Sequence, residues 1–246
     1  MSNTTLRLFF SAALGMSCAT AGSFDAVSGF SLSTNTATNL WSYWATSNTS
    51  VDSYAANVSI LPVLYNGSCG GGTSCWDASS GVQNLVLQNV TGSDFLFPNS
   101  DARNNQLTYY NRTGVVDIRF LVPTSGTYSL TGFFEGSANA PEATSDLIVL
   151  NGNVGSPLFS LGPALLSFGA VSNFSFAGVS LNAGDSVDFL VAGTQTTADA
   201  NSLATGFDAT FTQGSSSAVP EPGTISIVAA GLALIAWSGR RKALPR

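Results

Sequence analysis

The carboxylates are the first candidates for catalysis in this chain, because it contains no histidine. Without histidine, a Ser-His-Asp triad and histidine-based acid–base catalysis are both excluded. Two carboxylates that face each other could still hydrolyse a glycosidic bond. The central part of the chain offers Glu135 and Glu142, both in or near a loop rich in Gly, Ala and Pro that follows an expected strand. Carboxylates in such loops are usually solvated, so a glycoside hydrolase is the least favoured function.

Aromatic side chains are the second candidates, because their flat faces can pack against the apolar faces of sugar rings. An early cluster consists of Trp41, Tyr43, Trp44 and Tyr54. These rings could instead cap the core of a sandwich, and we favour the core for Trp41 and Trp44. Trp76 is the better exposed candidate, because it follows a Gly-rich loop. The candidate glycan contacts are therefore Trp76, Trp41 and Tyr43.

Two cysteines, Cys69 and Cys75, flank that Gly-rich loop. In an oxidising compartment they are expected to form a disulfide. Loop-closure entropy gives such a short cross-link about 2 kcal/mol of stability. A metal site is the alternative, but two thiols with no histidine nearby supply only half of a tetrahedral site.

Four aspartates late in the chain could include the ligands of a structural Ca²⁺, namely Asp185, Asp188, Asp199 and Asp208. They lack the Asp-x-Asp-x-Asp spacing of a calcium loop. We therefore expect no cofactor. Structural Ca²⁺ remains the alternative, with Asp185, Asp188 and Asp208 as its candidate ligands.

The elements that must position these residues are β-strands. No stretch between Phe24 and Gln213 shows a sustained 3.6-residue apolar period, whereas short alternating runs recur between turn residues. The clearest runs lie at 115–121, 127–134, 147–150, 174–179, 187–191 and 205–211. Asn151-Gly152 indicates a hairpin after the third run. About ten to thirteen strands within residues 22–211 predict one all-β domain, a single jelly-roll β-sandwich with a core rich in phenylalanine.

The N-terminus indicates export. Arg7 precedes a short apolar run at 8–14, and Ala19-Thr20-Ala21 fits the small-x-small cleavage rule. We therefore assign residues 1–21 to a signal peptide. Lipidation at Cys18 is the alternative, but Gly15 stands where a lipobox needs an aliphatic residue.

The charge balance argues against nucleic acid as a partner. The chain carries 14 acidic and 8 basic residues, a net charge of −6. Between the two ends its basic residues are Arg103, Arg112 and Arg119. Nucleic-acid binding needs a basic surface that these three do not supply.

The C-terminal tail has three parts in a fixed order, after a Ser-rich flexible linker at 212–219. Pro220-Glu221-Pro222 is stiff and extended, because proline fixes its own φ and disfavours helix in the residue before it. An uncharged apolar run follows at 224–238; as a transmembrane helix it would span about 22 Å, less than the ~30 Å hydrocarbon core. Arg240, Arg241 and Lys242 then form a basic stop on the cytoplasmic side. An ordinary C-terminal anchor is the alternative.

The three parts of this tail carry a specific resemblance. Val219-Pro220-Glu221-Pro222-Gly223, Gly231-Leu232-Ala233-Leu234 and Arg240-Arg241 together resemble the PEP-CTERM sorting tail of Gram-negative bacteria. The resemblance implies that an exosortase, a membrane transpeptidase, recognises Pro-Glu-Pro and removes the helix. It also implies a host that makes exopolysaccharide, transient anchoring in the inner membrane, and delivery to the cell envelope, the outer surface or the extracellular matrix.

The central domain carries a second resemblance. The patterns Pro123-x-x-Gly126-x-Tyr128-x-Leu130 and Leu181-x-Ala183-Gly184-Asp185-x-Val187-Asp188-Phe189 are similar to jelly-roll domains of PEP-CTERM proteins. They are also similar to carbohydrate-binding modules of the galactose-binding type. Much of this pattern is common to strands and turns of any jelly roll, so it supports the fold more than it supports glycan binding.

Together these features predict a non-enzymatic, exosortase-processed protein of the cell surface or extracellular matrix, associated with exopolysaccharide and biofilm. One alternative is a carbohydrate-binding module with a defined glycan site. Another is a structural or adhesive surface protein that binds protein partners, and the last is the hydrolase. The expected partners are an exosortase and exopolysaccharide or another glycan, with no nucleic acid.

Overall fold

The structure of the chain is a computed structural model. It describes residues 21–46, 54, 58–67, 69–78, 84–97, 100–111, 114–137, 143–165, 167–193 and 204–214. Within these ranges every assigned element is a β-strand, which confirms the all-β prediction. Residues 1–20 of the predicted signal peptide, the linker from residue 215 and the sorting tail lie outside the described residues.

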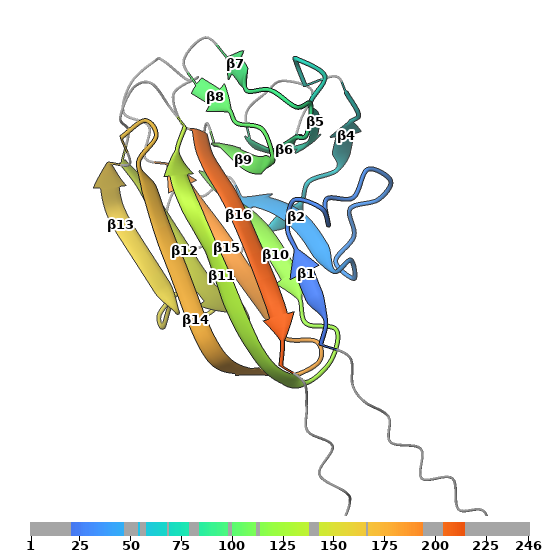
Figure 1. Ribbon diagram of the computed structural model, residues 1–246, viewed down its shortest axis with the longest axis vertical. Coiled ribbons are helices and arrows are strands. Elements are labelled where there is room, and N and C mark those ends of the chain that lie inside the picture. Colours follow the sequence, from blue (N-terminus) through green and yellow to red (C-terminus); the bar gives the residue numbers. More distant parts are fainter. Residues whose placement is uncertain are drawn as a thin grey trace, which may run out of the picture. The chain divides into compact units, whose positions relative to one another are not determined.

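Two sheets account for most of the strands (Figure 1). Sheet A follows the order β14-β11-β16-β9-β6-β5-β4, and β1 pairs with β16. Its strands are β1 (Ser23–Asp25), β4 (Val63–Tyr65), β5 (Ser74–Asp77), β6 (Asn84–Asn89), β9 (Gln106–Asn111), β11 (Gly126–Gly136), β14 (Val171–Leu181) and β16 (Ala204–Gln213). Sheet B follows the order β13-β12-β15-β10-β2-β3. Its strands are β2 (Trp41–Thr46), β3 (Ser59–Ile60), β10 (Gly114–Leu121), β12 (Ala143–Leu150), β13 (Phe159–Leu165) and β15 (Ser186–Gly193). A separate pair consists of β7 (Phe95–Phe97) and β8 (Ser100–Ala102).

Strands β9 to β16 alternate between the sheets in the pattern of a jelly roll. Their order is β14-β11-β16-β9 in sheet A and β13-β12-β15-β10 in sheet B. Counted along the chain, the first, third, sixth and eighth strands belong to sheet A and the others to sheet B, which is the arrangement of two interlocked Greek keys. The predicted single jelly-roll β-sandwich is therefore confirmed. Strands β6, β5 and β4 extend sheet A beyond β9, and β2 and β3 extend sheet B beyond β10.

Alternation along each strand decides which side chains enter the core between the sheets. On β10 the inward residues include Ile118 and Phe120, and on β16 they include Phe207 and Phe211. Phe120 stacks on Phe211 with ring centroids 4.0 Å apart. Burial of each such ring contributes roughly 1.5–3 kcal/mol. The core is rich in phenylalanine, as the sequence predicted.

Three local features differ from the sequence expectation. The described residues form sixteen strands rather than ten to thirteen, because short strands such as β3 and β7 are too brief to show alternation. Asn151 and Gly152 form a tight turn with φ of 51° and 69°, but β13 first pairs with β12 at Phe159 and Ile148, so the hairpin loop is longer than two residues. Strand β16 continues to Gln213, so the chain leaves the sheet later than the predicted linker start at residue 212.

Candidate functional site

The outer face of sheet B carries charged side chains on adjacent strands. Residues 116, 118 and 120 of β10 enter the core, so Asp117 and Arg119 point to the opposite face. Asp188 of β15 stands directly opposite Arg119 in the strand pair. Trp44 of β2 lies on the same face, with the guanidinium carbon of Arg119 4.5 Å from the centroid of its ring. Strand alternation thus gathers two acids, one base and one aromatic ring on one surface.

Tyr54, from the segment between β2 and β3, covers this face. It is fully buried and belongs to a second apolar cluster, separate from the main core. The other buried members of this cluster are Val115, Leu147, Val149, Leu190 and Ala192. Val58, which is itself half-buried, packs against them. Because the outer face is covered in this way, its charged groups are shielded from water and need partners within the protein.

A hydrogen-bonded network joins Tyr54, Asp117, Arg119 and Asp188. The Tyr54 hydroxyl donates to Oδ2 of Asp117 and accepts from Nη2 of Arg119 at 3.0 Å. Nε of Arg119 donates to Oδ1 of Asp188 and lies 3.7 Å from Oδ2 of Asp117. Both carboxylates are 0% exposed, whereas the Arg119 side chain is 19% exposed. Arg119 is therefore the charged member of the network that reaches solvent.

Burial controls the protonation of this network. Burial, and then the charge of Asp188, raise the pKa of the Asp117 carboxyl well above its ordinary value, against the opposing effect of Arg119. Burial also raises the pKa of the Tyr54 hydroxyl. For Arg119, burial lowers the pKa of the guanidinium, but Asp117, Tyr54 and Asp188 more than offset this and the net shift is upward. Tyr54 and Arg119 therefore keep their protons.

Asp188 also holds the turn that follows β12. Its Oδ2 accepts from the amide of Gly152 at 3.0 Å and from the Ser186 hydroxyl at 2.9 Å. Glycine adopts the φ of 69° at this position without strain, which lets the amide point at Asp188. Asn151 contributes its Oδ1 as acceptor for the amide of Ser186 at 2.7 Å, and its Nδ2 donates to Oδ1 of Asp185 at 3.1 Å. The turn and the start of β15 are thereby held as one unit.

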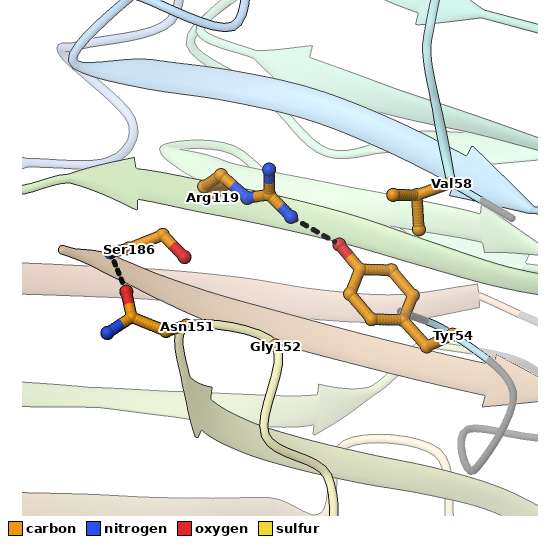
Figure 2. A pocket seen from close by; sticks show the side chains of 6 residues that line it. All are labelled: Tyr54, Val58, Arg119, Asn151, Gly152 and Ser186. Carbon is orange, nitrogen blue, oxygen red and sulfur yellow. Dashed lines mark hydrogen bonds between the residues drawn. The ribbon is translucent and has the colours of Figure 1, made fainter. Parts of the chain in front are cut away.

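A pocket of about 330 Å³ opens beside the network (Figure 2). Its lining residues are Tyr54, Val58, Arg119, Asn151, Gly152 and Ser186. Figure 2 shows the guanidinium of Arg119 turned toward the phenol oxygen of Tyr54, with Val58 beside the ring and Asn151 next to Ser186. The Tyr54 ring and Val58 supply apolar surface, and the other side chains supply donors and acceptors. The volume lies at the lower end of the ~300–1,000 Å³ range of small-molecule sites.

This arrangement suits binding better than acid–base chemistry. A glycosidase needs two carboxyl groups that face the scissile bond from either side. Here Asp117 and Asp188 are fully buried behind Tyr54 and Arg119 and are engaged by the network. The groups that face the pocket are a guanidinium, an amide, a hydroxyl and a ring, and small-molecule sites commonly use groups of these kinds to orient a ligand.

The predicted glycan contacts lie in the core instead. Trp41 is 2%, Tyr43 0% and Trp76 5% exposed, and all three belong to the main apolar cluster. Trp76 stands on β5, which pairs with β4 on one side and β6 on the other, and its Nε1 donates to the carbonyl of Ser31 at 2.9 Å. The Gly-rich loop ends before β5 begins, so its exposure does not extend to Trp76. Burial of Trp41 agrees with the core position that the sequence favoured, whereas burial of Tyr43 and Trp76 contradicts their assignment as surface contacts. Trp44, also expected in the core, lies on the outer face of sheet B against Arg119 instead.

The candidate calcium ligands are not brought together. Asp188 is bound to Arg119, and Asp185 caps the turn before β15 by accepting from the amide of Asn182 at 2.8 Å. Asp208 lies on β16 in the other sheet, near Asp25. Within the described ranges no group of three or more metal-ligating side chains occurs. Asp199 lies outside the described residues. The three aspartates therefore do not form one site.

The remaining candidates have structural partners. Cys69 and Cys75 are joined in a disulfide, with Cα atoms 6.1 Å apart. Glu135, expected in a solvated loop, is instead 3% exposed at the end of β11 and forms an ion pair with Arg103 at 2.8 Å. Its other oxygen accepts from Nε2 of Gln106 at 2.7 Å. Glu142 lies outside the described residues.

The sorting residues also lie outside the described part of the chain, so their evidence comes from sequence. Among the described residues, no helix has the length and apolar character needed to cross a bilayer. The family model of the PEP-CTERM protein-sorting motif matches residues 218–242. The chain carries a PEP-CTERM sorting motif. The match includes Pro220-Glu221-Pro222 and the basic stop, and it marks an exported protein that is sorted to the cell envelope.

Comparison with known proteins adds only distant neighbours. No curated protein matches the chain. A family 35 carbohydrate-binding module from Clostridium thermocellum is 18% identical, with a TM-score of 0.29, over 52% of this chain and 98% of that module. The C-terminal CBM6 of a marine laminarinase from Zobellia galactanivorans is 11% identical, with a TM-score of 0.26, over 44% of this chain and 80% of that module. TmCBM61, solved with β-1,4-galactotriose, is 9% identical, with a TM-score of 0.29, over 44% and 70%.

Sequence reasoning missed the pocket, although one signal for it was present. In the run 115–121, Asp117 and Arg119 alternate with apolar residues, so both must share the face opposite the core. Two charges on the non-core face of a strand usually face water. Nothing local to β10 indicates that Tyr54 covers them.

Proposed function

We propose that this exported protein is a non-enzymatic binding module, and that the pocket on the outer face of sheet B holds one sugar unit of a glycan. The observation that carries the proposal is the composition of the pocket. The Tyr54 ring and Val58 offer apolar surface, while Arg119, Asn151 and Ser186 offer hydrogen-bonding groups. A sugar ring combines the same two kinds of surface, because its hydroxyl groups surround apolar patches of C–H bonds. Small-molecule sites commonly combine apolar walls with a few fixed polar groups.

The rigidity of the lining supports this proposal. Arg119 is held by Asp188 and by the Tyr54 hydroxyl, and it stacks on Trp44. Asn151 and Ser186 are held by the hydrogen bond between the Asn151 side chain and the Ser186 amide. Groups that are fixed before binding lose little conformational entropy when a ligand arrives. The side chains that line the pocket are thus fixed in place before a ligand binds.

Two observations favour binding over hydrolysis. Asp117 and Asp188 are buried in the network, and the exposed Asp185 is bound by the Asn182 amide and the Asn151 side chain. Glu135 is occupied by Arg103 and Gln106. The chain also has no histidine to serve as a general acid or base. We therefore place the protein among non-catalytic components of the cell surface or extracellular matrix.

The sorting motif supports a setting in which glycans are at hand. An exosortase that removes the tail would release the jelly roll from the inner membrane of a Gram-negative host. The glycan would then be the exopolysaccharide of the host or of its biofilm. A structural or adhesive role toward protein partners is the competing function.

The test is a glycan array, together with the exopolysaccharide of the host, probed with the full-length exported protein and with two matched variants. Val58→Phe fills the pocket from a half-buried position that takes no part in the polar network. Val90→Phe makes the same change at a valine that is 57% exposed and not part of the pocket. We expect saturable binding that Val58→Phe abolishes and Val90→Phe preserves. No glycan binding, or binding that Val58→Phe leaves intact, would overturn the proposal.

A further inference from the structure

Of the six residues that line the pocket, Arg119 is the charged one. A guanidinium in a binding site normally anchors a carboxylate or phosphate through paired hydrogen bonds. Here the Nε position is already bound to Asp188, and Nη2 is bound to the Tyr54 hydroxyl. The edge of Arg119 that would receive an anion is therefore partly occupied by the protein itself.

Two carboxyl groups lie next to this guanidinium, and a third lies next to the pocket wall. Asp188 touches it directly, and Oδ2 of Asp117 lies 3.7 Å from its Nε. A third carboxylate, Asp185, is hydrogen-bonded to the Asn151 side chain in the pocket wall at 3.1 Å. Even if Asp117 carries a proton, the charge of Arg119 is balanced by Asp188, and Asp185 remains. The positive charge of Arg119 is thus fully balanced by carboxylates that contact residues of the pocket.

An anionic ligand would meet an unfavourable arrangement in this pocket. It would lose its hydration and approach two carboxylates, Asp185 and Asp188, for one guanidinium that is already paired. A neutral ligand avoids this cost and can still accept from the guanidinium and bond to Asn151 and Ser186.

We propose that the pocket selects a neutral sugar unit and discriminates against the corresponding uronic acid. This inference rests on the proposed function, since it names the class of sugar that the same pocket accepts. It predicts that the protein recognises neutral positions of a glycan even where the polymer also carries acidic sugars.

The test compares the methyl glycosides of glucose, galactose and mannose with those of glucuronate, galacturonate and mannuronate, by calorimetric titration of the full-length protein at neutral pH. We expect at least one neutral glycoside to bind about tenfold or more tightly than its uronate. Added salt should narrow that ratio by screening the repulsion, without changing the affinity for the neutral glycoside. The variant Asp185→Asn should raise the affinity for uronates about threefold, because it removes the negative charge next to the Asn151 wall of the pocket. Asp208→Asn, on the other sheet, is the matched control and should leave the ratio unchanged.

The outcomes separate this inference from the function on which it rests. A uronate that binds as tightly as its neutral partner, or more tightly, overturns the neutral selectivity and leaves glycan binding in place. If Asp185→Asn does not alter the ratio of neutral to uronate affinity, the role of the Asp185 carboxylate is overturned. Failure of all six glycosides to bind overturns the proposed function together with this inference.

Discussion

Arg119 donates its Nε proton to Oδ1 of Asp188, the residue directly opposite it on the neighbouring strand. This cross-strand pair lies on the outer face of sheet B, beside Tyr54. Asp188 also fixes part of the pocket wall, because its second oxygen accepts hydrogen bonds from the Gly152 amide and the Ser186 hydroxyl. One carboxylate thus sets the positions of both the guanidinium and the turn.

Loss of the Asp188 charge should therefore cost stability. Asp188→Asn leaves the guanidinium of Arg119 facing an amide in a mostly buried site, and we expect the free energy of unfolding to fall by about 3 kcal/mol in urea denaturation. Asp185→Asn is the control, because Asp185 occupies an exposed turn and the one side-chain oxygen of asparagine can still accept from the Asn182 amide. It should cost less than about 1 kcal/mol. Equal losses in the two variants would contradict the role assigned to Asp188.

The Tyr54 hydroxyl should contribute to the stability of the fold in addition to the contribution of the Tyr54 ring. Tyr54→Phe keeps the apolar contacts but leaves Oδ2 of Asp117 and Nη2 of Arg119 without this partner. We expect a loss of about 1–3 kcal/mol, measured as a lower denaturation midpoint with an unchanged slope. Tyr65→Phe, at a half-buried tyrosine on β4, should change stability by less than about 0.5 kcal/mol. A silent Tyr54→Phe would show that the network is satisfied without the hydroxyl.

The disulfide should stabilise the Gly-rich loop and should leave no free thiol in the folded domain. Thiol alkylation without reductant is expected to label neither Cys69 nor Cys75. Replacing both residues by serine should lower the free energy of unfolding by about 2 kcal/mol, because the cross-link closes a short loop. Mass spectrometry after alkylation and denaturant titration measure the two effects. Labelling of either cysteine in the native protein would show that the bond is absent.

Asp208 should make stability fall as pH rises. Burial, and then the charge of Asp25, raise the pKa of the Asp208 carboxyl to about 6. Because the folded pKa exceeds the unfolded value, this group stabilises the fold fully below about pH 4, and that contribution is lost as the pH rises through 6. Asp208→Asn should therefore be more stable than the native protein at pH 7. Asp208 is partly open to solvent, so we expect a gain of about 1 kcal/mol.

Thermal unfolding between pH 4 and pH 7 measures this effect. The advantage of Asp208→Asn should grow across that range to about 2–4 °C. Asp185 provides a control of opposite sign, because hydrogen bonds from the Asn182 amide and the Asn151 side chain lower the pKa of its carboxyl. Its contribution is present at neutral pH and is lost as the pH falls through the folded pKa. An Asp208→Asn variant with no pH-dependent advantage would contradict the burial of the carboxyl.

The sorting tail should be removed in cells that carry an exosortase. Intact-mass analysis of the mature protein is expected to find no residues beyond about Pro222, because the stiff Pro-Glu-Pro segment presents the cleavage region to the enzyme. Glu221→Ala should leave the tail attached, and so should deletion of the exosortase. Recovery of Arg246 in the mature native protein would contradict processing at this motif.

Several features of this protein follow from sequence alone, because they depend on neighbours along the chain. The sorting motif is a contiguous segment of the chain. The all-β class, and the placement of Asp117 and Arg119 on the face opposite the core, follow from a period of two residues. The cysteine pair could be proposed from its short spacing and the compartment. Each of these inferences needs only a few adjacent residues.

The tertiary structure decided which faces are covered. Tyr54 reaches Arg119 across 65 residues of sequence, and that contact converts an apparently solvated face into a buried network with a pocket beside it. Trp76, expected at the surface, lies in the core because its ring packs into the main apolar cluster and its Nε1 reaches the carbonyl of Ser31, 45 residues away in sequence. Local period shows that two faces exist, but it does not show what packs on each of them. Burial depends on segments brought together by strand pairing over long distances, so the site emerged only when the whole sandwich was assembled.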